Sequence, residues 1–220
     1  YVGDPANTIR IFNELEVDEL CVLDISATRD GREPDFELLE ELAGEAFMPL
    51  CYGGGVRSTG TIARLLRTGF EKVAINSYGF DDPYIFRRAA DAFGSQAIVA
   101  SIDVRKNILG RYEVVTRNAT SKTGRDPASW AAEVARKGAG EILLTSVDRE
   151  GTWSGYDTEL IASVTRRVDV PVIAHGGAGS ISDIRRALRE GGAAAVALGS
   201  MVVFQAKGFG ALFITHSIAE

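Results

Sequence analysis

The sequence is poor in the residues that mark extracellular, metal-binding and membrane proteins. It has two cysteines and two histidines among 220 residues, so a disulfide framework or a Cys/His metal site has little support. It has no run of about 18 apolar residues, and no charged segment followed by an apolar one, as a membrane span or a secretory signal would have. We therefore expect a cytoplasmic protein without a membrane partner.

An excess of positive charge is also missing. The formal net charge is −6, which argues against nucleic acid as a partner, because binding to phosphate backbones needs a basic surface. Cys21 and Cys51 each lie in an apolar run with no second ligand at metal-binding spacing. We interpret both as reduced core thiols.

Short runs rich in Val, Ile and Leu alternate with amphipathic helical segments along the whole chain, which is typical of βα units on a parallel sheet. The expected strands cover residues 19–24, 47–52, 72–76, 96–103, 141–146, 170–175 and 194–199. Seven helical segments follow or precede them, and residues 104–124 form a segment too long for an ordinary loop. Its centre, NILG, predicts a β-hairpin.

The chain repeats itself. LCYGGGVRS (50–58) and IAHGGAGS (173–180) are similar, and a shift of 122 residues also pairs Asp35 with Asp157 and Pro49 with Pro171. This predicts one α/β domain over residues 1–220, a (βα)8 TIM barrel made of half-barrels 1–95 and 96–220. The strand ending at Asp103 has no partner in the first half. We expect its partner, the first strand, in about 25–30 residues upstream of Tyr1, by analogy with the second half.

The ends of the strands indicate where chemistry occurs, because barrel active sites lie at the C-terminal ends of the strands. Each glycine turn is followed by a helix, a strand and a serine, and such turns can bind phosphate through backbone N–H groups. Glycines in tight turns can also be purely structural. The candidate substrate and phosphate ligands are Asp24, Gly54, Gly55, Asn76, Ser77, Ser146, Glu150, Gly151, His175, Gly176, Gly177, Gly199 and Ser200.

The two turns define two cups related by the repeat. The first cup contains Gly54, Gly55, Asn76 and Ser77, and the second contains Gly176, Gly177, Gly199 and Ser200. Cups on opposite sides of the mouth suit a small molecule with a phosphate at each end.

The reactive middle of such a ligand would lie over the barrel axis. Asp103 ends a strand there, and we favour it as a catalytic acid or base over a loop cap. For Asp24 both interpretations stay open. Glu150 is either a loop organiser or a substrate contact, and His175 could assist a phosphate. Trp153 is expected to contact a loop tip.

Several stretches resemble one known family. SIDVRKN, SKTG, GAGEILLTSVDREGTWSGYDTELI and PVIAHGGAGS are similar to the cyclase subunit of imidazole glycerol phosphate synthase, the HisF family. The resemblance covers essentially the whole chain. It implies a lyase that uses ammonia from a glutaminase subunit, as a heterodimer, to convert a bisphosphate ribonucleotide into imidazole glycerol phosphate and aminoimidazole carboxamide ribonucleotide in histidine biosynthesis.

The resemblance also implies roles for single residues. Asp103 matches one of two catalytic aspartates, and the other belongs to the strand expected upstream. Glu19, Lys72 and Glu141 match a charged ring through which ammonia enters the barrel. Without the family they would be ordinary salt bridges of the bottom rim. No metal and no cofactor is implied.

Two positions depart from the family pattern, which usually has Asp at Glu150 and often Ser at His175. The beginning of the chain, FMPLCYGGG and the tail 204–220, which lacks a clear long helix, are more similar to a paralogous branch that uses ammonia to amidinate a bacterial surface sugar. That function is an alternative. A non-catalytic phosphate-binding or scaffold barrel is another, and a sugar isomerase of similar architecture fits less well because of residues 138–179.

Overall fold

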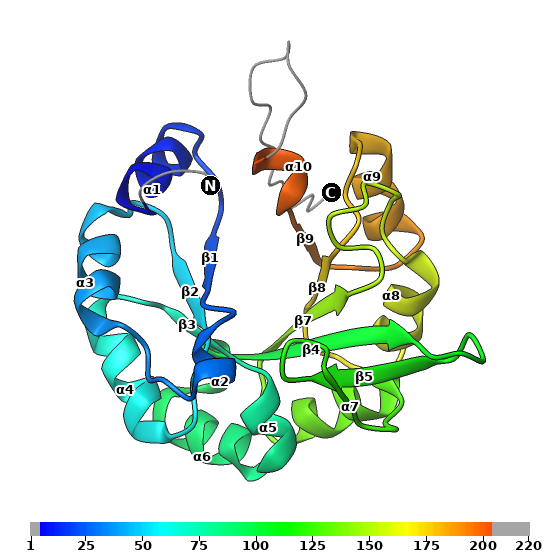
Figure 1. The fold of residues 1–220 in the computed structure, drawn as a ribbon, viewed down its shortest axis with the longest axis horizontal. Coiled ribbons are helices and arrows are strands. Elements are labelled where there is room, and N and C mark those ends of the chain that lie inside the picture. Colours follow the sequence, from blue (N-terminus) through cyan, green and yellow to red (C-terminus); the bar gives the residue numbers. More distant parts are fainter. Residues whose placement is uncertain (1–4, 204–220) are drawn as a thin grey trace.

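A computed structural model describes residues 5–203 as a curled parallel sheet with helices on its outer side (Figure 1). The strand order is β1-β2-β3-β4-β7-β8-β9, with β5 and β6 branching from β4. The strands are β1 (Leu20–Leu23), β2 (Leu50–Gly53), β3 (Lys72–Ile75), β4 (Ile98–Lys106), β5 (Tyr112–Thr116), β6 (Ser121–Lys122), β7 (Glu141–Ser146), β8 (Val172–His175) and β9 (Ala195–Ala197). All seven strands expected for the barrel are present.

The helices connect successive strands as the alternating pattern predicts. They are α1 (Pro5–Glu14), α2 (Ala27–Asp30), α3 (Phe36–Glu45), α4 (Thr59–Thr68), α5 (Ser77–Asp81), α6 (Tyr84–Phe93), α7 (Pro127–Arg136), α8 (Thr158–Thr165), α9 (Ile181–Arg189) and α10 (Ser200–Val203), with a 3-10 turn at Ser95–Ala97. The short helices α2, α5 and α10 were not expected from the sequence. A helix of four or five residues is too short to show a periodic apolar pattern.

Repeated N-caps show how closely the halves match. Asp35 accepts a hydrogen bond from the backbone N–H of Leu38, and Asp157 does the same for Leu160. Ser58 and Ser180 cap α4 and α9 in the same manner. A capping side chain satisfies a backbone N–H that the first helical turn leaves unpaired. The repeat in the sequence is thus a repeat of helix starts as well as of glycine turns.

The sheet curls without closing on itself within residues 5–203. β1 and β9 form the two edges, and Figure 1 shows an opening between them. The predicted α/β barrel is therefore confirmed as a TIM-barrel-like fold, and residues 5–203 contribute seven parallel strands to it. The domain range and the half-barrel boundaries at residue 95 remain predictions.

Side chains alternate between the two faces of the sheet. The outward face and the helices form one large core, which includes Leu50, Tyr52 and Ile102. The inward face forms a second, smaller cluster of short and aliphatic side chains, contributed by Cys51, Ala74, Val99 and Leu143 with Ile173 and Ala197 packed against it. The barrel interior is therefore apolar in its middle layer.

The prediction that both cysteines are core thiols is wrong for Cys21. Cys51 is buried, whereas Cys21 is exposed, although the two lie side by side in the register of β1 and β2. Cys21 belongs to the edge strand, and its side chain points to the inward face beside the opening. Both thiols are free.

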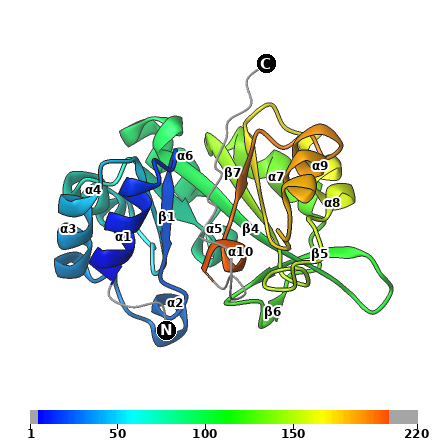
Figure 2. The ribbon, with the colours of Figure 1, turned by 90° about the horizontal axis from the view of Figure 1, so that it is seen from above.

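The long segment after Asp103 is a hairpin, as predicted. β4 begins at Ile98, two residues after the expected start at 96, and continues to Lys106. β5 pairs with it in antiparallel fashion. Figure 2 shows this hairpin at the same end of the barrel as α2 and α10. The hairpin therefore stands at the mouth.

One prediction, the absence of a clear long helix in the tail 204–220, concerns residues outside the described range. Within the range, no helix is long and apolar enough to cross a membrane.

Candidate active site

A cavity of about 510 Å³ opens at the C-terminal ends of the strands. It is lined from both halves of the barrel, and Asp103, Asn76 and His175 all face it. The first cup contributes Gly54, Gly55 and Ser77 to its wall, whereas Gly176, Gly177, Gly199 and Ser200 do not line it. The cavity is therefore centred on the first cup and on Asp103.

The glycines of both turns are needed because backbones approach closely there. A methyl group added at Gly54 would lie 2.6 Å from the carbonyl oxygen of Asp24, and one at Gly176 would lie 2.6 Å from that of Ser146. The φ angles of the two glycines are 136° and 96°, which side chains disfavour. Asp24 and Ser146 occupy equivalent places in the repeat, so the turns have a structural reason to be glycine in addition to any role with phosphate.

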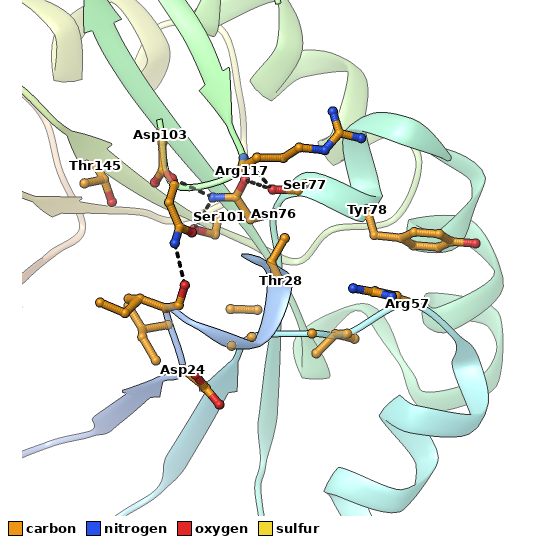
Figure 3. Close-up of a pocket in the computed structure, with 18 of the residues that line it drawn as sticks. Asp24, Thr28, Arg57, Asn76, Ser77, Tyr78, Ser101, Asp103, Arg117 and Thr145 are labelled. Atoms are coloured by element: carbon orange, nitrogen blue, oxygen red, sulfur yellow. Dashed lines mark hydrogen bonds between the residues drawn. The ribbon is translucent and has the colours of Figure 1, made fainter. Parts of the chain in front are cut away.

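The first cup connects directly to Asp103 (Figure 3). Asn76 donates through Nδ2 to Asp103 Oδ2 at 2.9 Å and to Ser101 Oγ at 3.3 Å. Ser77, the first residue of α5, accepts a hydrogen bond of 2.9 Å from the backbone N–H of Arg117. The Asn76 side chain therefore joins the cup to the candidate acid or base, and the turn between β5 and β6 borders the other side.

The turn between β5 and β6 covers the first cup in a strained conformation. Arg117, Asn118 and Ala119 have φ angles of 53°, 56° and 60°, and three successive non-glycine residues in this region are unusual. Asn118 donates to the carbonyl oxygen of Ile25 at 2.5 Å, and Arg117 pairs with Asp81 at 3.0 Å. This turn is thereby held to the β1–α2 loop and to α5, and Arg117 is one of the residues that line the cavity.

Asp103 is in the environment of an acid–base group. Burial raises the pKa of its carboxyl, and the hydrogen bond from Asn76, the charge of His175 and a hydrogen bond from Thr145 oppose that rise only in part. A carboxyl with a raised pKa can carry a proton closer to neutral pH than an exposed one. The residue predicted to be catalytic therefore lies in the cavity with suitable electrostatics.

The Asp24 carboxylate orders the loop that follows β1. Its Oδ1 accepts hydrogen bonds from the backbone N–H groups of Ser26 and Ala27, each at 3.0 Å, and Arg32 pairs with it at 3.0 Å. Burial alone would raise the pKa of Asp24, but these hydrogen bonds and the charge of Arg32 lower it. Of the two interpretations left open by the sequence, the structure favours a carboxylate that orders the β1–α2 turn.

The second cup is filled by side chains. His175 Nε2 lies 3.4 Å from Glu150 Oε2, and a methyl group on Gly199 would lie 3.1 Å from Glu150 Oε1. Trp153 donates through Nε1 to Ser200 Oγ at 3.2 Å. The tryptophan thus makes the loop-tip contact that was predicted. The acidic partner of His175 was missed, because it comes from a loop 25 residues away in the sequence.

Two further candidate ligands lie away from the cavity. Ser146 is 6% exposed and is on the outward side of β7, and its carbonyl oxygen lies close to Gly176. Gly151 lies in the exposed part of the β7–α8 loop. Thr145 and Ser101 line the cavity instead. The alternation of β-strands could have identified both, because each lies an even number of residues from an inward-facing neighbour, Glu141 or Asp103.

An ion cluster lies at the opposite end of the barrel. Lys72 Nζ lies 2.7 Å from Glu19 Oε2 and 2.8 Å from Glu141 Oε2. Burial would lower the pKa of Lys72, but the hydrogen bonds and charges of the two glutamates raise it, so the lysine remains charged. The three residues predicted as an ammonia gate are therefore in contact, beneath the apolar middle layer.

The arrangement defines a class of protein: a TIM-barrel-like enzyme whose active face, at the C-terminal strand ends, carries a protonatable aspartate beside a polar turn. The profile of the histidine biosynthesis protein family matches residues 1–207. The chain belongs to that family.

The curated relatives specify the family further. The chain is 48% identical over 207 residues to a Pseudomonas aeruginosa protein provisionally named imidazole glycerol phosphate synthase subunit hisF2, covering 94% of this chain and 82% of the relative. A provisionally named HisF subunit from Leptospira borgpetersenii is 45% identical, over 93% of this chain and 81% of the relative. Imidazole glycerol phosphate synthase subunit HisF from Trichormus variabilis is 42% identical, over 91% and 79%. The chain is thus a HisF-like enzyme of the lyase class.

Proposed function

We propose that this chain is an ammonia-using cyclase subunit. It converts a bisphosphate ribonucleotide into imidazole glycerol phosphate and aminoimidazole carboxamide ribonucleotide, in histidine biosynthesis. The observation that carries the proposal is the position of Asp103, a partly buried carboxyl with a raised pKa. It lines the cavity beside the first cup, and His175, which directly precedes the second cup in the sequence, also lines the cavity.

The two cups support a ligand with two phosphates. Gly55 and Gly177 are followed by helices α4 and α9, whose N-termini favour negative charge. In the first cup Ser77 and the guanidinium of Arg117 add a hydroxyl and a positive charge. A ligand that reaches from one cup to the other has its middle over Asp103.

The interior of the barrel supports a path for ammonia. Neutral ammonia can cross the apolar middle layer formed around Ala74 and Val99, whereas ammonium would have to lose its hydration there at a large cost in free energy. The Lys72 cluster closes the lower end. A glutaminase subunit bound at that end, as a heterodimer, would deliver ammonia at the cluster, and the ion pairs of Lys72 must part to admit it.

Turnover tests the proposal. The chain should convert the bisphosphate ribonucleotide with ammonium salts as the nitrogen source, and Asp103→Asn should lower kcat by about 10²- to 10⁴-fold, the usual contribution of a general acid or base. Full activity in Asp103→Asn would remove Asp103 from the mechanism. Absence of turnover in the unaltered full chain, with and without a glutaminase subunit, would contradict the cyclase function.

A second candidate is an ammonia-using subunit for amidination of a bacterial surface sugar. The observation that favours it is the second cup, where Glu150 and His175 occupy the region expected to receive a phosphate. Complementation of a histidine auxotroph separates the two functions. Growth supports the cyclase, and failure to grow with a folded, expressed chain supports the sugar pathway.

A further inference from the structure

A continuous row of polar side chains crosses the mouth from one cup to the other. It begins at Asn76, passes through Asp103 and Thr145, and reaches His175 and Glu150. The row follows the sheet register, in which Asp103 pairs with Thr145 and Thr145 with His175 on the neighbouring strands β4, β7 and β8. Nothing in the proposed function requires the part of the row beyond Asp103.

Thr145 lies between the two ends of the row. It is the register partner of Asp103, and its Oγ1 lies 3.2 Å from His175 Nδ1. A hydroxyl has one hydrogen to donate, so Thr145 can donate to Asp103 only while it accepts from an Nδ1–H of His175. Nε2 of the same ring lies 3.4 Å from Glu150 Oε2.

We propose that His175, held by Glu150, exchanges a proton with Asp103 through the hydroxyl of Thr145. In the forward step the Thr145 O–H proton moves to the Asp103 carboxylate while the His175 Nδ1 proton moves to Thr145 Oγ1. Asp103 becomes neutral, Thr145 is unchanged, and His175 becomes a neutral imidazole that keeps its Nε2–H toward Glu150. The reverse step restores the ionised pair. Glu150 acts here as a positioning residue.

The surroundings of the row support the exchange. The His175 charge is the one charged group that acts on Asp103 among the residues described in 5–203, and it lowers the carboxyl pKa against the effect of burial. The other groups facing Asp103 are the neutral Asn76 and, through Asn76, Ser101. On the far side, Glu150 faces His175 and also raises the pKa of Tyr156, after the larger effect of burial. The Glu150 side chain is 36% exposed.

The first half of the barrel provides the matched variant. The repeat position of His175 is Gly53, and Gly53 has no side chain at the mouth. His175→Gly therefore copies a structure that the barrel already tolerates, and it leaves space for added imidazole. Thr145→Val removes only the hydroxyl, Thr145→Ser keeps it, and Glu190→Gln on the exposed end of α9 is a control for the loss of one carboxylate.

The inference rests on the role of Asp103 in the proposed function. Two measurements test the proton exchange separately from the cyclase function. The first follows the Asp103 carboxyl by 13C NMR against pH, without substrate, with Asp103→Asn as the assignment control. His175→Gly and Thr145→Val should move the Asp103 midpoint to higher pH, while Thr145→Ser and Glu190→Gln leave it in place. An unchanged midpoint in His175→Gly overturns the inference, whether or not the enzyme turns over.

The second measurement is steady-state turnover with ammonium salts. His175→Gly and Thr145→Val should lower kcat about tenfold or more while KM stays within about threefold, since they impair proton transfer in the manner of general acid–base variants. Free imidazole should restore part of the kcat of His175→Gly, and not that of Thr145→Val. If the variants lost kcat/KM only through a higher KM, or if imidazole did not rescue His175→Gly, the exchange would be contradicted. If the variants shifted the Asp103 midpoint in a chain that shows no turnover, the result would support the exchange and contradict the cyclase function.

Discussion

The two glycine turns have the same backbone and different occupants. In both, a glycine approaches a carbonyl oxygen of the preceding strand end, and a capped helix follows. Beside the first cup lie Gly53 and Thr28, and Arg57 and Arg117 line the adjoining cavity. The shift of 122 residues places His175 and Glu150 at the corresponding positions beside the second cup.

Comparison of the two turns separates the structural part of the repeat from the part that differs in chemistry. The glycines and helix caps are kept in both halves because the backbone geometry needs them. The charged side chains differ, so each cup has its own electrostatic preference. The first is lined by Arg57 and by Arg117, whose guanidinium is paired with Asp81, whereas in the second His175 lies beside the carboxylate of Glu150. We therefore expect phosphate to bind more tightly in the first cup.

The shared backbone can be tested by removing one glycine at a time. Gly55 and Gly177 have φ angles of 64° and 99°, and an added methyl group would lie 2.6 Å from the carbonyl oxygen of Arg32 or 2.4 Å from that of Gly155. Gly55→Ala and Gly177→Ala should each lower the free energy of unfolding by about 1–3 kcal/mol. Urea unfolding measures both.

Gly44 is the matched control for these two variants. It lies inside α3 with no atom within 4 Å of an added methyl group. Gly44→Ala should raise the free energy of unfolding by about 0.5–1 kcal/mol, the difference in helix propensity. Equal stability of all three variants would contradict the view that the turns are glycine for steric reasons.

The different occupants can be tested by giving the second cup the residues of the first. The double variant His175→Gly with Glu150→Thr should bind inorganic phosphate in the second cup about tenfold more tightly, equivalent to about 1.4 kcal/mol. The reason is the removal of a carboxylate beside the dianion, since like charges about 4 Å apart repel by several kcal/mol near a protein surface. Titration calorimetry gives the affinity, and weaker binding in the double variant would contradict the assigned preference.

The first cup can be weakened without touching the second. Arg117→Ala should lower the affinity of that cup for inorganic phosphate by about three- to tenfold, the contribution of one exposed charge-assisted hydrogen bond. Arg111→Ala, in the turn between β4 and β5, is the control and should leave the affinity unchanged. If the two variants behaved alike, Arg117 would have no specific role in the cup.

The two mouth aspartates should respond to pH in opposite directions. Asp24 has a lowered pKa in the fold, so it stabilises the protein above its unfolded pKa of about 4, and this stability is lost as the pH falls through the folded pKa. Asp103 has a raised pKa, so its ionisation costs stability as the pH rises through that value.

The measurement is urea unfolding at pH 7 and near pH 4. Asp24→Asn should be less stable than the unaltered chain at pH 7, and the difference should shrink at the lower pH. Asp103→Asn should be more stable at pH 7, with the gap again shrinking at the lower pH. A loss of stability in Asp103→Asn at pH 7 would mean that its carboxylate is structural, like that of Asp24.

The sequence predicted most of the fold because βα units leave strong local patterns. Strand and helix positions, the hairpin and the repeat all follow from alternation of apolar runs, glycines and caps. The residues brought together by the register of separate strands were harder to foresee. The contact of His175 with Glu150 depends on how the β7–α8 loop folds over the second turn, and the approach of Arg117 to Ser77 depends on the strained turn between β5 and β6. Neither has a local signature in the chain.

The most direct test of the account is a site-resolved titration with inorganic phosphate, followed by the backbone amide NMR signals of the two cups. The account predicts that the signals of Gly55 and Ser77 shift and saturate at lower phosphate concentration than those of Gly177 and Ser200, which also shift. Saturation of Gly177 and Ser200 first, or no shift in either pair, would contradict the claim that the repeat provides two unequal phosphate cups.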